Sequence, residues 1–262
     1  MITSSILKEY LLYEEQHTWE FIPKHLSRVI ITIPHDGTYR NHDLRYLYQP
    51  RKEGVFGPDK HIAALSLDIL PITQIIAIRG LLPRGFVDYN RSLKGDEHYD
   101  PCLPDGTPEK ALEDSTLQNF YHHYHDRISA SIKRMGTIFG KEHLLLLDIH
   151  GYKTQPLEQE YDLILGTGNK STVQNKVDES FAWFFQEKNY KVFLPDHKPR
   201  QSDVDDPFNG AFTVRYHTQE HNINGIQIEI APRFRTNKGK ELGKKLASDI
   251  ASFIEFYNNL HN

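Results

Sequence analysis

Four consecutive leucines, Leu144–Leu147, form the most apolar tetrad of the chain, and charged residues flank them. A short apolar run of this kind is typical of a central strand that is buried on both faces of a sheet. Other β-branched, apolar or alternating runs predict further strands, and longer stretches have helical periodicity. The expected strands are 28–33, 74–78, 85–88, 162–165, 192–194, 211–215 and 225–230, and the expected helices are 59–70, 108–135, 172–188 and 238–258. Because strands alternate with helices, we expect an α/β fold in which helices flank a mixed, mostly parallel sheet.

The length of the chain favours one domain. A chain of 262 residues suits a single large domain, and no repeat, low-complexity tract or linker divides it, so residues 1–262 are expected to form one unit. Its 14 Phe and 14 Tyr can fill a substantial core. Two polar stretches, 93–106 and 198–210, are expected to be loops, and loops as long as the second are commonly functional in compact domains.

The composition excludes several classes of protein. The net charge is −4 and the basic residues are scattered, whereas a nucleic-acid-binding protein shows a clustered basic excess. No run approaches the roughly 18 apolar residues that a membrane-spanning helix needs, so we expect neither a nucleic acid nor a membrane as a partner. The single cysteine, Cys102, excludes an internal disulfide framework and a cysteine-rich zinc module. The N-terminus does not read as a secretory signal, so we expect a cytoplasmic protein, and the oligomeric state stays open.

Reactive side chains follow four of the expected strands at the point where each strand ends. These side chains are, in chain order, His35, Asn90 with Arg91, His150 and Glu229. In open α/β sheets, ligands bind beyond the carboxyl ends of the strands. We therefore expect these residues to line one shared cleft.

Each of these residues also has a structural interpretation. A lone histidine after a strand is more often structural, but His35 and His150 together favour a metal site. Asp148, two residues before His150, would orient its ring, as carboxylates commonly do for metal-bound histidines. Asn90 and Arg91 offer an amide and a planar fork that suit a substrate carboxylate, although in isolation a surface ion pair would explain them.

Three other features carry weaker signals. Glu229 lies in an alternating run, and a carboxylate on a central strand is costly unless it is paired or functional. The histidines of the run 120–125 are interpreted as aromatic packing, with at most one of them lining the cleft. The Gly-Thr-Gly of 166–168 is interpreted as a turn, because a dinucleotide fingerprint needs three spaced glycines that open a helix.

An ordered set of motifs between about residues 30 and 235 resembles the N-formylglutamate amidohydrolase (deformylase) family, a relative of the zinc carboxypeptidases. Each motif alone is weak, but their order is fairly specific. One departure is Gly151, where the larger family often has Ser. The motifs are Pro-His-Asp-Gly at 34–37, Arg-Gly-Phe-Val-Asp-Tyr-Asn-Arg at 84–91, Asp-Ile-His-Gly at 148–151, Asn-Gly at 209–210 and Gly-Ile-Gln-Ile-Glu-Ile at 225–230, with Asp59, His61 and the Tyr-His pairs at 121–122 and 124–125 as further family features. The resemblance implies a phosphorylase/hydrolase-like fold of the zinc carboxypeptidase kind.

The resemblance also implies one zinc ion. His35 and His150 look like two of its ligands. The carboxypeptidase pattern places a glutamate three residues after the first histidine, and Thr38 stands there instead. Asp59 and Asp36 are the candidates for the third ligand. We favour Asp59, because adjacent residues rarely reach one metal from a tight turn.

The remaining matches are implied to act on the substrate. Glu229 corresponds to the glutamate that serves as general base toward metal-activated water. Arg84 and Arg215 are further basic candidates for a second carboxylate or for the oxyanion. The candidate substrate-binding residues are Asn90, Arg91 and Asn209.

We therefore expect a zinc-dependent enzyme that hydrolyses an amide bond in a small molecule bearing a carboxylate, such as an N-formyl- or N-acyl-glutamate. A zinc carboxypeptidase or a polyglutamate hydrolase would use the same cleft and is the alternative among enzymes. A non-catalytic binding module with this fold is the alternative of another class. The presence of all the reactive residues at the strand ends disfavours that module.

Overall fold

One mixed sheet runs through the described part of the chain. The computed structural model describes residues 10–15, 17–23, 26–37, 58–59, 61–73, 75–93, 115–153, 159–194, 210 and 212–261. The strands are β1 (Tyr10–Glu15), β2 (Thr18–Pro23), β3 (Val29–Ile33), β4 (Ile76–Gly80), β5 (Leu145–His150), β6 (Leu163–Gly166), β7 (Val192–Phe193) and β8 (Asn224–Ile230). They lie in the order β1-β2-β4-β3-β5-β8-β6-β7, and four of the seven neighbouring pairs are parallel. The predicted α/β fold with a mixed, mostly parallel sheet is thereby confirmed.

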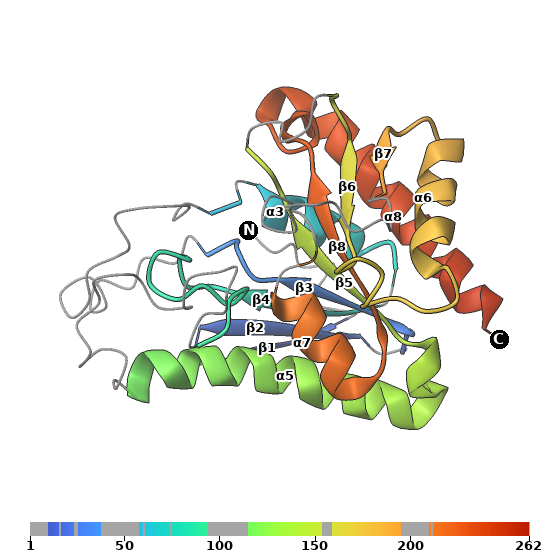
Figure 1. Cartoon of the computed structure of the whole chain (residues 1–262). Helices are drawn as coiled ribbons and strands as arrows, with labels where there is room; N and C mark the ends of the chain where they lie inside the picture. The colour runs from blue at the N-terminus through green and yellow to red at the C-terminus, as the bar shows by residue number, and fades with distance from the viewer. Residues whose placement is uncertain are drawn as a thin grey trace.

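Helices cover both faces of this sheet (Figure 1). The first face carries α5 (Ser115–Phe139) and α7 (Phe212–His221), and the second carries α3 (Ile62–Ile69), α6 (Val177–Glu187) and α8 (Lys240–Leu260). Three short 3-10 helices complete the described elements, namely η1 (Lys141–His143), η3 (Pro232–Phe234) and η4 (Asn237–Gly239). No helix among the described residues is long and apolar enough to cross a membrane.

The leucine tetrad forms the middle of the sheet, as predicted. Strand β5 lies between β3 and β8, and all its residues are buried. Successive side chains of a strand point to opposite faces. Leu144 and Leu146 accordingly pack in the core beneath α5, while Leu145 and Leu147 pack in the core that α3, α6 and α8 close. Both faces of β5 are covered, which explains why the run is continuously apolar rather than alternating.

The predicted strand 85–88 is wrong. Residues 84–86 form a turn in which the N–H of Phe86 donates to the carbonyl of Pro83, at 2.8 Å. The apolar side chains of Val87 and Tyr89 are buried against α5 instead of within the sheet. Their burial produces the apolar signal without any strand pairing.

The predicted strand 211–215 is wrong as well, because Phe212–His221 is the helix α7. Five residues are too few to separate a period of two from a period of 3.6. The buried positions of α7 reveal the helical period only over the whole element, at Thr213, Val214, His217, Thr218 and His221.

Two predicted helices begin three and five residues later than expected. Helix α3 begins at Ile62, after His61 at a φ of 64°, so Asp59 precedes the helix instead of opening it. Helix α6 begins at Val177, not at Thr172. The expected loop 198–210 lies outside the described residues apart from Gly210, and of the expected loop 93–106 only Leu93 is described.

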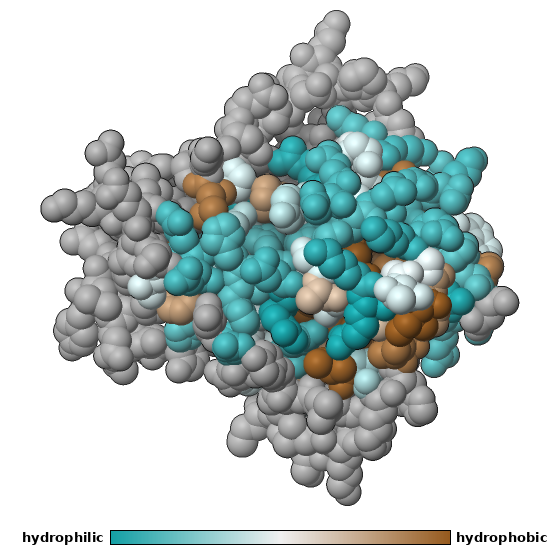
Figure 2. All heavy atoms as spheres, turned by 90° about the horizontal axis from the view of Figure 1, so that it is seen from below, coloured by the Kyte–Doolittle hydropathy of each residue, from teal (hydrophilic) through white to brown (hydrophobic). Residues whose placement is uncertain are grey.

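A buried ion pair fastens α5 to β2, the second strand of the sheet. Glu20 on β2 is 1% exposed, and its carboxylate accepts from Nε of Arg127 at 2.7 Å and from the Ser131 hydroxyl at 2.7 Å. Arg134 lies 3.7 Å away. The outer face of α5 is turned toward the viewer in Figure 2, where hydrophilic side chains predominate. The helix is therefore anchored on its inner side by charge as well as by apolar packing.

We expect Arg127→Met to lower the free energy of unfolding by about 3 kcal/mol, because the buried Glu20 carboxylate loses this arginine as its partner. Glu20→Gln should cost less, since the Arg127 side chain is 29% exposed and can regain water. Urea unfolding followed by circular dichroism measures both losses, with Lys133→Met on the exposed side of α5 as the control. Equal losses for the Arg127 and Glu20 variants would contradict this asymmetry.

Candidate active site

The carboxyl ends of three neighbouring strands bring the candidate residues together. Strands β3, β5 and β8 are adjacent and parallel. His35 follows β3 by two residues, His150 ends β5, and Glu229 on β8 is the register partner of His150. Partners in register point to the same face of a sheet. The site therefore lies at the carboxyl edge, on the face that α5 and α7 cover.

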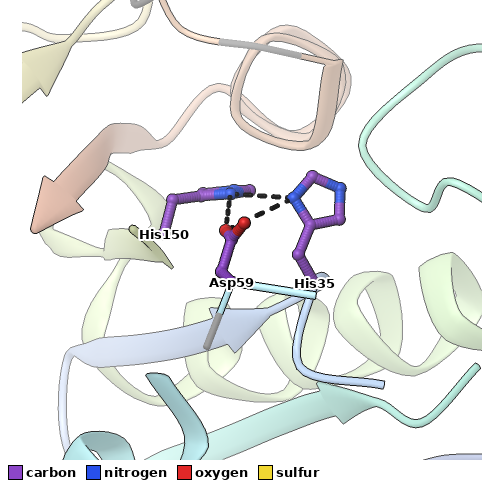
Figure 3. A group of neighbouring side chains, drawn as sticks. All are labelled: His35, Asp59 and His150. Atoms are coloured by element: carbon purple, nitrogen blue, oxygen red, sulfur yellow. Dashed lines mark hydrogen bonds and ion pairs between the residues drawn. The ribbon is translucent and has the colours of Figure 1, made fainter. Parts of the chain in front are cut away.

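Three side-chain atoms from three segments converge on one point (Figure 3). Nδ1 of His35 lies 3.1 Å from Nδ1 of His150. Oδ2 of Asp59 lies 3.2 Å from the same His150 atom and 3.6 Å from Nδ1 of His35. The backbone joins the segments too, because the N–H of Asp59 donates to the carbonyl of His35 at 2.8 Å.

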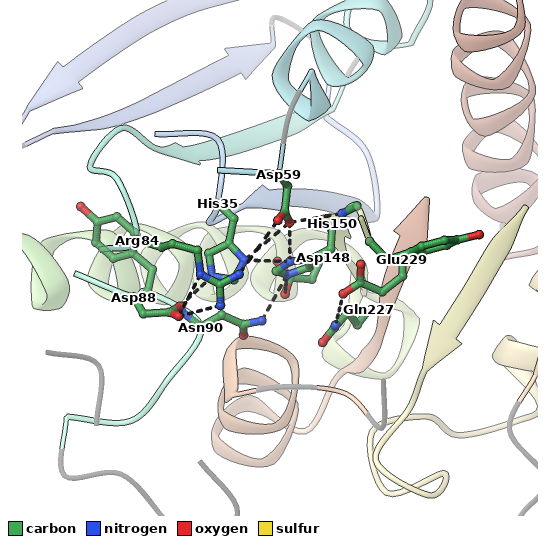
Figure 4. Close-up of polar contacts among 12 residues, drawn as sticks. His35, Asp59, Arg84, Asp88, Asn90, Asp148, His150, Gln227 and Glu229 are labelled. Carbon is green, nitrogen blue, oxygen red and sulfur yellow. Dashed lines mark hydrogen bonds and ion pairs between the residues drawn. The ribbon is translucent and has the colours of Figure 1, made fainter. Parts of the chain in front are cut away.

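A buried carboxylate stands behind each imidazole ring (Figure 4). Nε2 of His35 lies 2.6 Å from Oδ1 of Asp88, and Nε2 of His150 lies 2.9 Å from Oδ2 of Asp148. The Thr32 hydroxyl holds the other oxygen of Asp148 at 2.6 Å. Because an ionised carboxylate only accepts hydrogen bonds, each Nε2 carries the ring proton of a neutral imidazole and each Nδ1 keeps its lone pair. The carboxylates thus fix the tautomer that a metal ligand requires.

The chemistry of this donor set fits a divalent cation. Two lone pairs and a carboxylate oxygen that face one another repel unless a positive charge lies between them. Donor atoms about 2.0–2.1 Å from a tetrahedral zinc ion are roughly 3.3 Å apart, close to the measured separations of 3.1, 3.2 and 3.6 Å. Among the described residues, His35, Asp59 and His150 are also the group of histidines and carboxylates that could hold a metal.

Asp36 is engaged elsewhere. Its carboxylate accepts from Nε of Arg79 on β4 at 2.5 Å, and it is 5% exposed. Of the two candidates for a third ligand, the structure brings Asp59 to the histidines and pairs Asp36 with an arginine.

The pKa values reflect the same concentration of charge. Burial alone would lower the pKa of His150, but the carboxylates of Asp148 and Asp59 outweigh it and raise that pKa well above its usual value. Burial would raise the pKa of Asp59, and the adjacent imidazoles of His150 and His35 instead hold it far below the usual value. The carboxylates around His150 therefore favour a positive charge at this point, as a bound cation would supply. Burial raises the pKa of Glu229, which suits a group that takes up a proton.

Asp88 joins the histidine to the predicted substrate-binding residues. Its Oδ2 accepts from Arg84 at 2.7 Å and from Nε of Arg91 at 3.2 Å, and its Oδ1 accepts from the backbone N–H of Asn90 at 3.1 Å. The pKa of Asp88 lies well below its usual value because these cations and His35 outweigh burial. The Asn90 amide nitrogen lies 3.2 Å from Nε2 of His150. The run 84–91 thus lies beside the histidines as predicted, although it is a turn.

The other predicted residues are less closely placed. Arg215 is carried by α7, and its side chain lies beside Gly168 in the turn after β6. Asn209 lies outside the described residues. His125 of the aromatic run is buried and contacts the backbone of Tyr89, so it is a neighbour of the site and not only a packing residue.

The family profile described as N-formylglutamate amidohydrolase matches residues 27–234. The chain belongs to this family. It is therefore an amidohydrolase, as the ordered motifs indicated. No curated protein matches the chain.

Two solved structures share the fold of this amidohydrolase, and a third matches it more weakly. The N-formylglutamate amidohydrolase from Ralstonia eutropha JMP134 superposes with a TM-score of 0.67 at 18% identity, over 92% of this chain and 99% of that one. A gene product from Agrobacterium tumefaciens superposes with a TM-score of 0.62 at 15% identity, over 88% of this chain and 90% of that one. A metallo-carboxypeptidase from Pseudomonas aeruginosa gives a TM-score of 0.45 at 12% identity, over 94% of this chain and 64% of that one.

Arg235 is a site neighbour that the sequence analysis did not single out. It is 7% exposed, and it donates from Nε to the carbonyl of Ile230 at 3.1 Å and from Nη2 to the carbonyl of Tyr152 at 2.5 Å. The guanidinium thereby clamps the chain after β8 to the chain after β5. It also lies against Gly151, where a Cβ would come within 2.8 Å of Nη1. The glycine that departs from the larger family thus leaves the space that this guanidinium occupies.

We expect Gly151→Ala to destabilise the amidohydrolase by about 1–3 kcal/mol, the usual cost of overpacking a filled site. The methyl group would displace the guanidinium and break both of its carbonyl contacts. In an Arg235→Ala background the same substitution should cost much less, and a double-mutant cycle in urea unfolding measures the difference. Gly136→Ala, in the interior of α5, is the matched control; its methyl group would meet Cγ of the exposed Lys141 side chain at 2.9 Å, which can move aside, so it should cost less. Purely additive losses would show that Arg235 is not the reason for Gly151.

Proposed function

We propose that this amidohydrolase depends on one zinc ion held by His35, Asp59 and His150, and that it hydrolyses the amide bond of an N-acyl amino acid with a carboxylate, such as N-formylglutamate. The observation that carries the proposal is the convergence of two imidazole lone pairs and one carboxylate oxygen, each histidine being backed by its own buried carboxylate. The substrate class is drawn from the family and from the basic residues beside the histidines.

Zinc bound there would supply a Lewis acid for the amide carbonyl and for water. The three protein ligands match the ligand number of catalytic zinc sites, which keep a further position for water or substrate. Asp88 and Asp148 hold the rings in the ligating tautomer, and Arg84 neutralises the negative charge that Asp88 brings to the site.

Glu229 is the proposed general base. Its carboxylate is 8% exposed, is held by the Gln227 amide at 2.9 Å and is the register partner of His150. The burial that raises its pKa makes Glu229 a stronger base toward the attacking water. Having taken that proton, the same carboxyl group delivers it to the leaving nitrogen.

Asn90 and Arg91 are proposed to orient the substrate carboxylate. The Nε of Arg91 is fixed on Asp88, which directs the side chain from the turn that borders the histidines. A planar guanidinium matches the geometry of a carboxylate. Arg84, Arg215 and Asn209 are proposed as supporting groups for a second carboxylate or for the oxyanion.

The experiment that tests the proposal is a hydrolysis screen over N-formyl and N-acetyl amino acids, with and without a chelator. We expect activity toward acidic amino-acid derivatives, its loss on chelation and its return when zinc is added. Purified Asp59→Asn should no longer contain zinc in a near-stoichiometric amount. Asp36→Asn, which changes a carboxylate one residue from His35, should still contain it. Full activity of metal-free protein, or equal zinc loss in the two variants, would refute the metal assignment.

A second expectation concerns the base. Glu229→Gln keeps the shape of the side chain and removes its proton acceptor, so turnover should fall by roughly 10²–10⁴-fold while zinc stays bound. Steady-state kinetics with metal analysis of the same sample measures both. Gln227→Ala serves as the comparison, since it removes a hydrogen bond to Glu229 and leaves the carboxylate in place. Near-normal turnover of Glu229→Gln would remove this residue from the mechanism.

A further inference from the structure

Two buried histidines connect helices α5 and α7 to the turn that carries the proposed substrate-binding residues. Nε2 of His125 lies 3.0 Å from the carbonyl oxygen of Tyr89, and Nδ1 of His125 lies 3.0 Å from Nε2 of His217. His125 is 5% exposed and His217 is fully buried. The two rings are stacked, with centroids 5.2 Å apart.

The Tyr89 carbonyl, at one end of this series of hydrogen bonds, determines which nitrogen of each ring carries the proton. A carbonyl only accepts, so Nε2 of His125 carries the hydrogen and its Nδ1 is the acceptor. Nε2 of His217 must then donate, which leaves the lone pair of that ring on Nδ1, where no described residue forms a hydrogen bond to it. Burial lowers the pKa of His125 to about 3 and that of His217 well below its usual value, so both rings stay neutral near pH 7.

Tyr89 lies between two residues of the site. Asp88, on one side, backs the ring of His35 at 2.6 Å. Asn90, on the other side, accepts through its side-chain oxygen from the backbone N–H of Thr213 at 2.8 Å. The Thr213 hydroxyl also contacts the Tyr89 carbonyl oxygen, at 3.4 Å. Helices α5 and α7 therefore hold the backbone between Asp88 and Asn90 from one side.

This anchoring matters because the turn lacks the support of the sheet. Residues 84–91 belong to no strand, so no ladder of hydrogen bonds fixes their position. A buried backbone carbonyl that loses a hydrogen-bond donor shifts to strengthen its remaining contacts, here the 3.4 Å contact with the Thr213 hydroxyl. A shift at Tyr89 would move the Asn90 amide directly.

We propose that His125 is a positioning residue for the amidohydrolase reaction, which holds the Tyr89 carbonyl and thereby sets the Asn90 amide against the substrate carboxylate. His217 supports it by donating to Nδ1 of His125, which holds the tilt of that ring. The inference rests on the proposed function of Asn90.

The test compares His125→Leu with His125→Gln. Leucine removes the donor, whereas the glutamine amide places an N–H near the position of Nε2. We expect His125→Leu to raise KM for an N-acylglutamate roughly tenfold, as for about 1.4 kcal/mol of lost binding, with kcat and zinc content little changed. His125→Gln should recover most of the loss. His221→Leu is the matched control, because His221 stacks on His217 at 5.9 Å but bonds to Ser129.

A double-mutant cycle separates positioning from general damage. In an Asn90→Ala background, His125→Leu should raise KM no further, because the group through which it acts is absent. Additive effects, equal KM values for the leucine and glutamine variants, or an equal effect of His221→Leu would each overturn the proposal.

Hydrogen exchange gives a readout that does not depend on activity. His125→Leu should speed exchange of the Thr213 backbone N–H, which bonds to Asn90, while His221→Leu leaves it unchanged. If the wild-type protein hydrolyses no N-acyl amino acid, the proposed function fails, and this measurement still decides whether His125 positions Asn90. Unchanged exchange at Thr213 in His125→Leu would overturn the positioning.

Discussion

Two imidazole nitrogens and a carboxylate oxygen lie within 3.6 Å of one another in a mostly buried part of this molecule. These electron pairs repel one another unless a cation lies between them. Most of the neighbouring residues keep the three donor atoms in the positions that such a cation needs. Asp88 and Asp148 turn the rings, while Arg84 and Arg91 neutralise Asp88. The parallel order of β3, β5 and β8 supplies the convergence itself, because it brings three strand ends to one edge.

Strand β5 shows how one face serves two purposes. On the α5 side, Leu144 just before the strand and Leu146 within it lie in the core, and the next positions on that side are Asp148 and His150. A fully buried carboxylate is costly unless it is satisfied. Both oxygens of Asp148 have partners, in Thr32 and His150. The change from apolar to polar along a single face marks where the core ends and the reactive cleft begins.

The sequence predicts the strand ends well and the surrounding supports poorly. His35, His150 and Glu229 follow from apolar strands that end in reactive residues, a local pattern. The hairpin of β1 and β2 gave no signal, because Gln16-His17 replaces the Asn-Gly or Asp-Gly that usually marks a two-residue connection. The contact of Arg235 with Gly151 joins distant segments, so neither residue reveals the other until the chain is folded. His125 looked like helix packing for the same reason.

The pairing of β5 with β8 has a consequence for the evolution of this enzyme. His150 faces Glu229 only because Leu145 is aligned with Asn224, and side chains alternate between the two faces of a sheet. Loss of one residue within β8 would present an isoleucine to the cleft and turn the carboxylate toward the opposite helices. Insertions and deletions are therefore tolerable in the connections but not inside β8. Within this strand the sequence can change only by substitution.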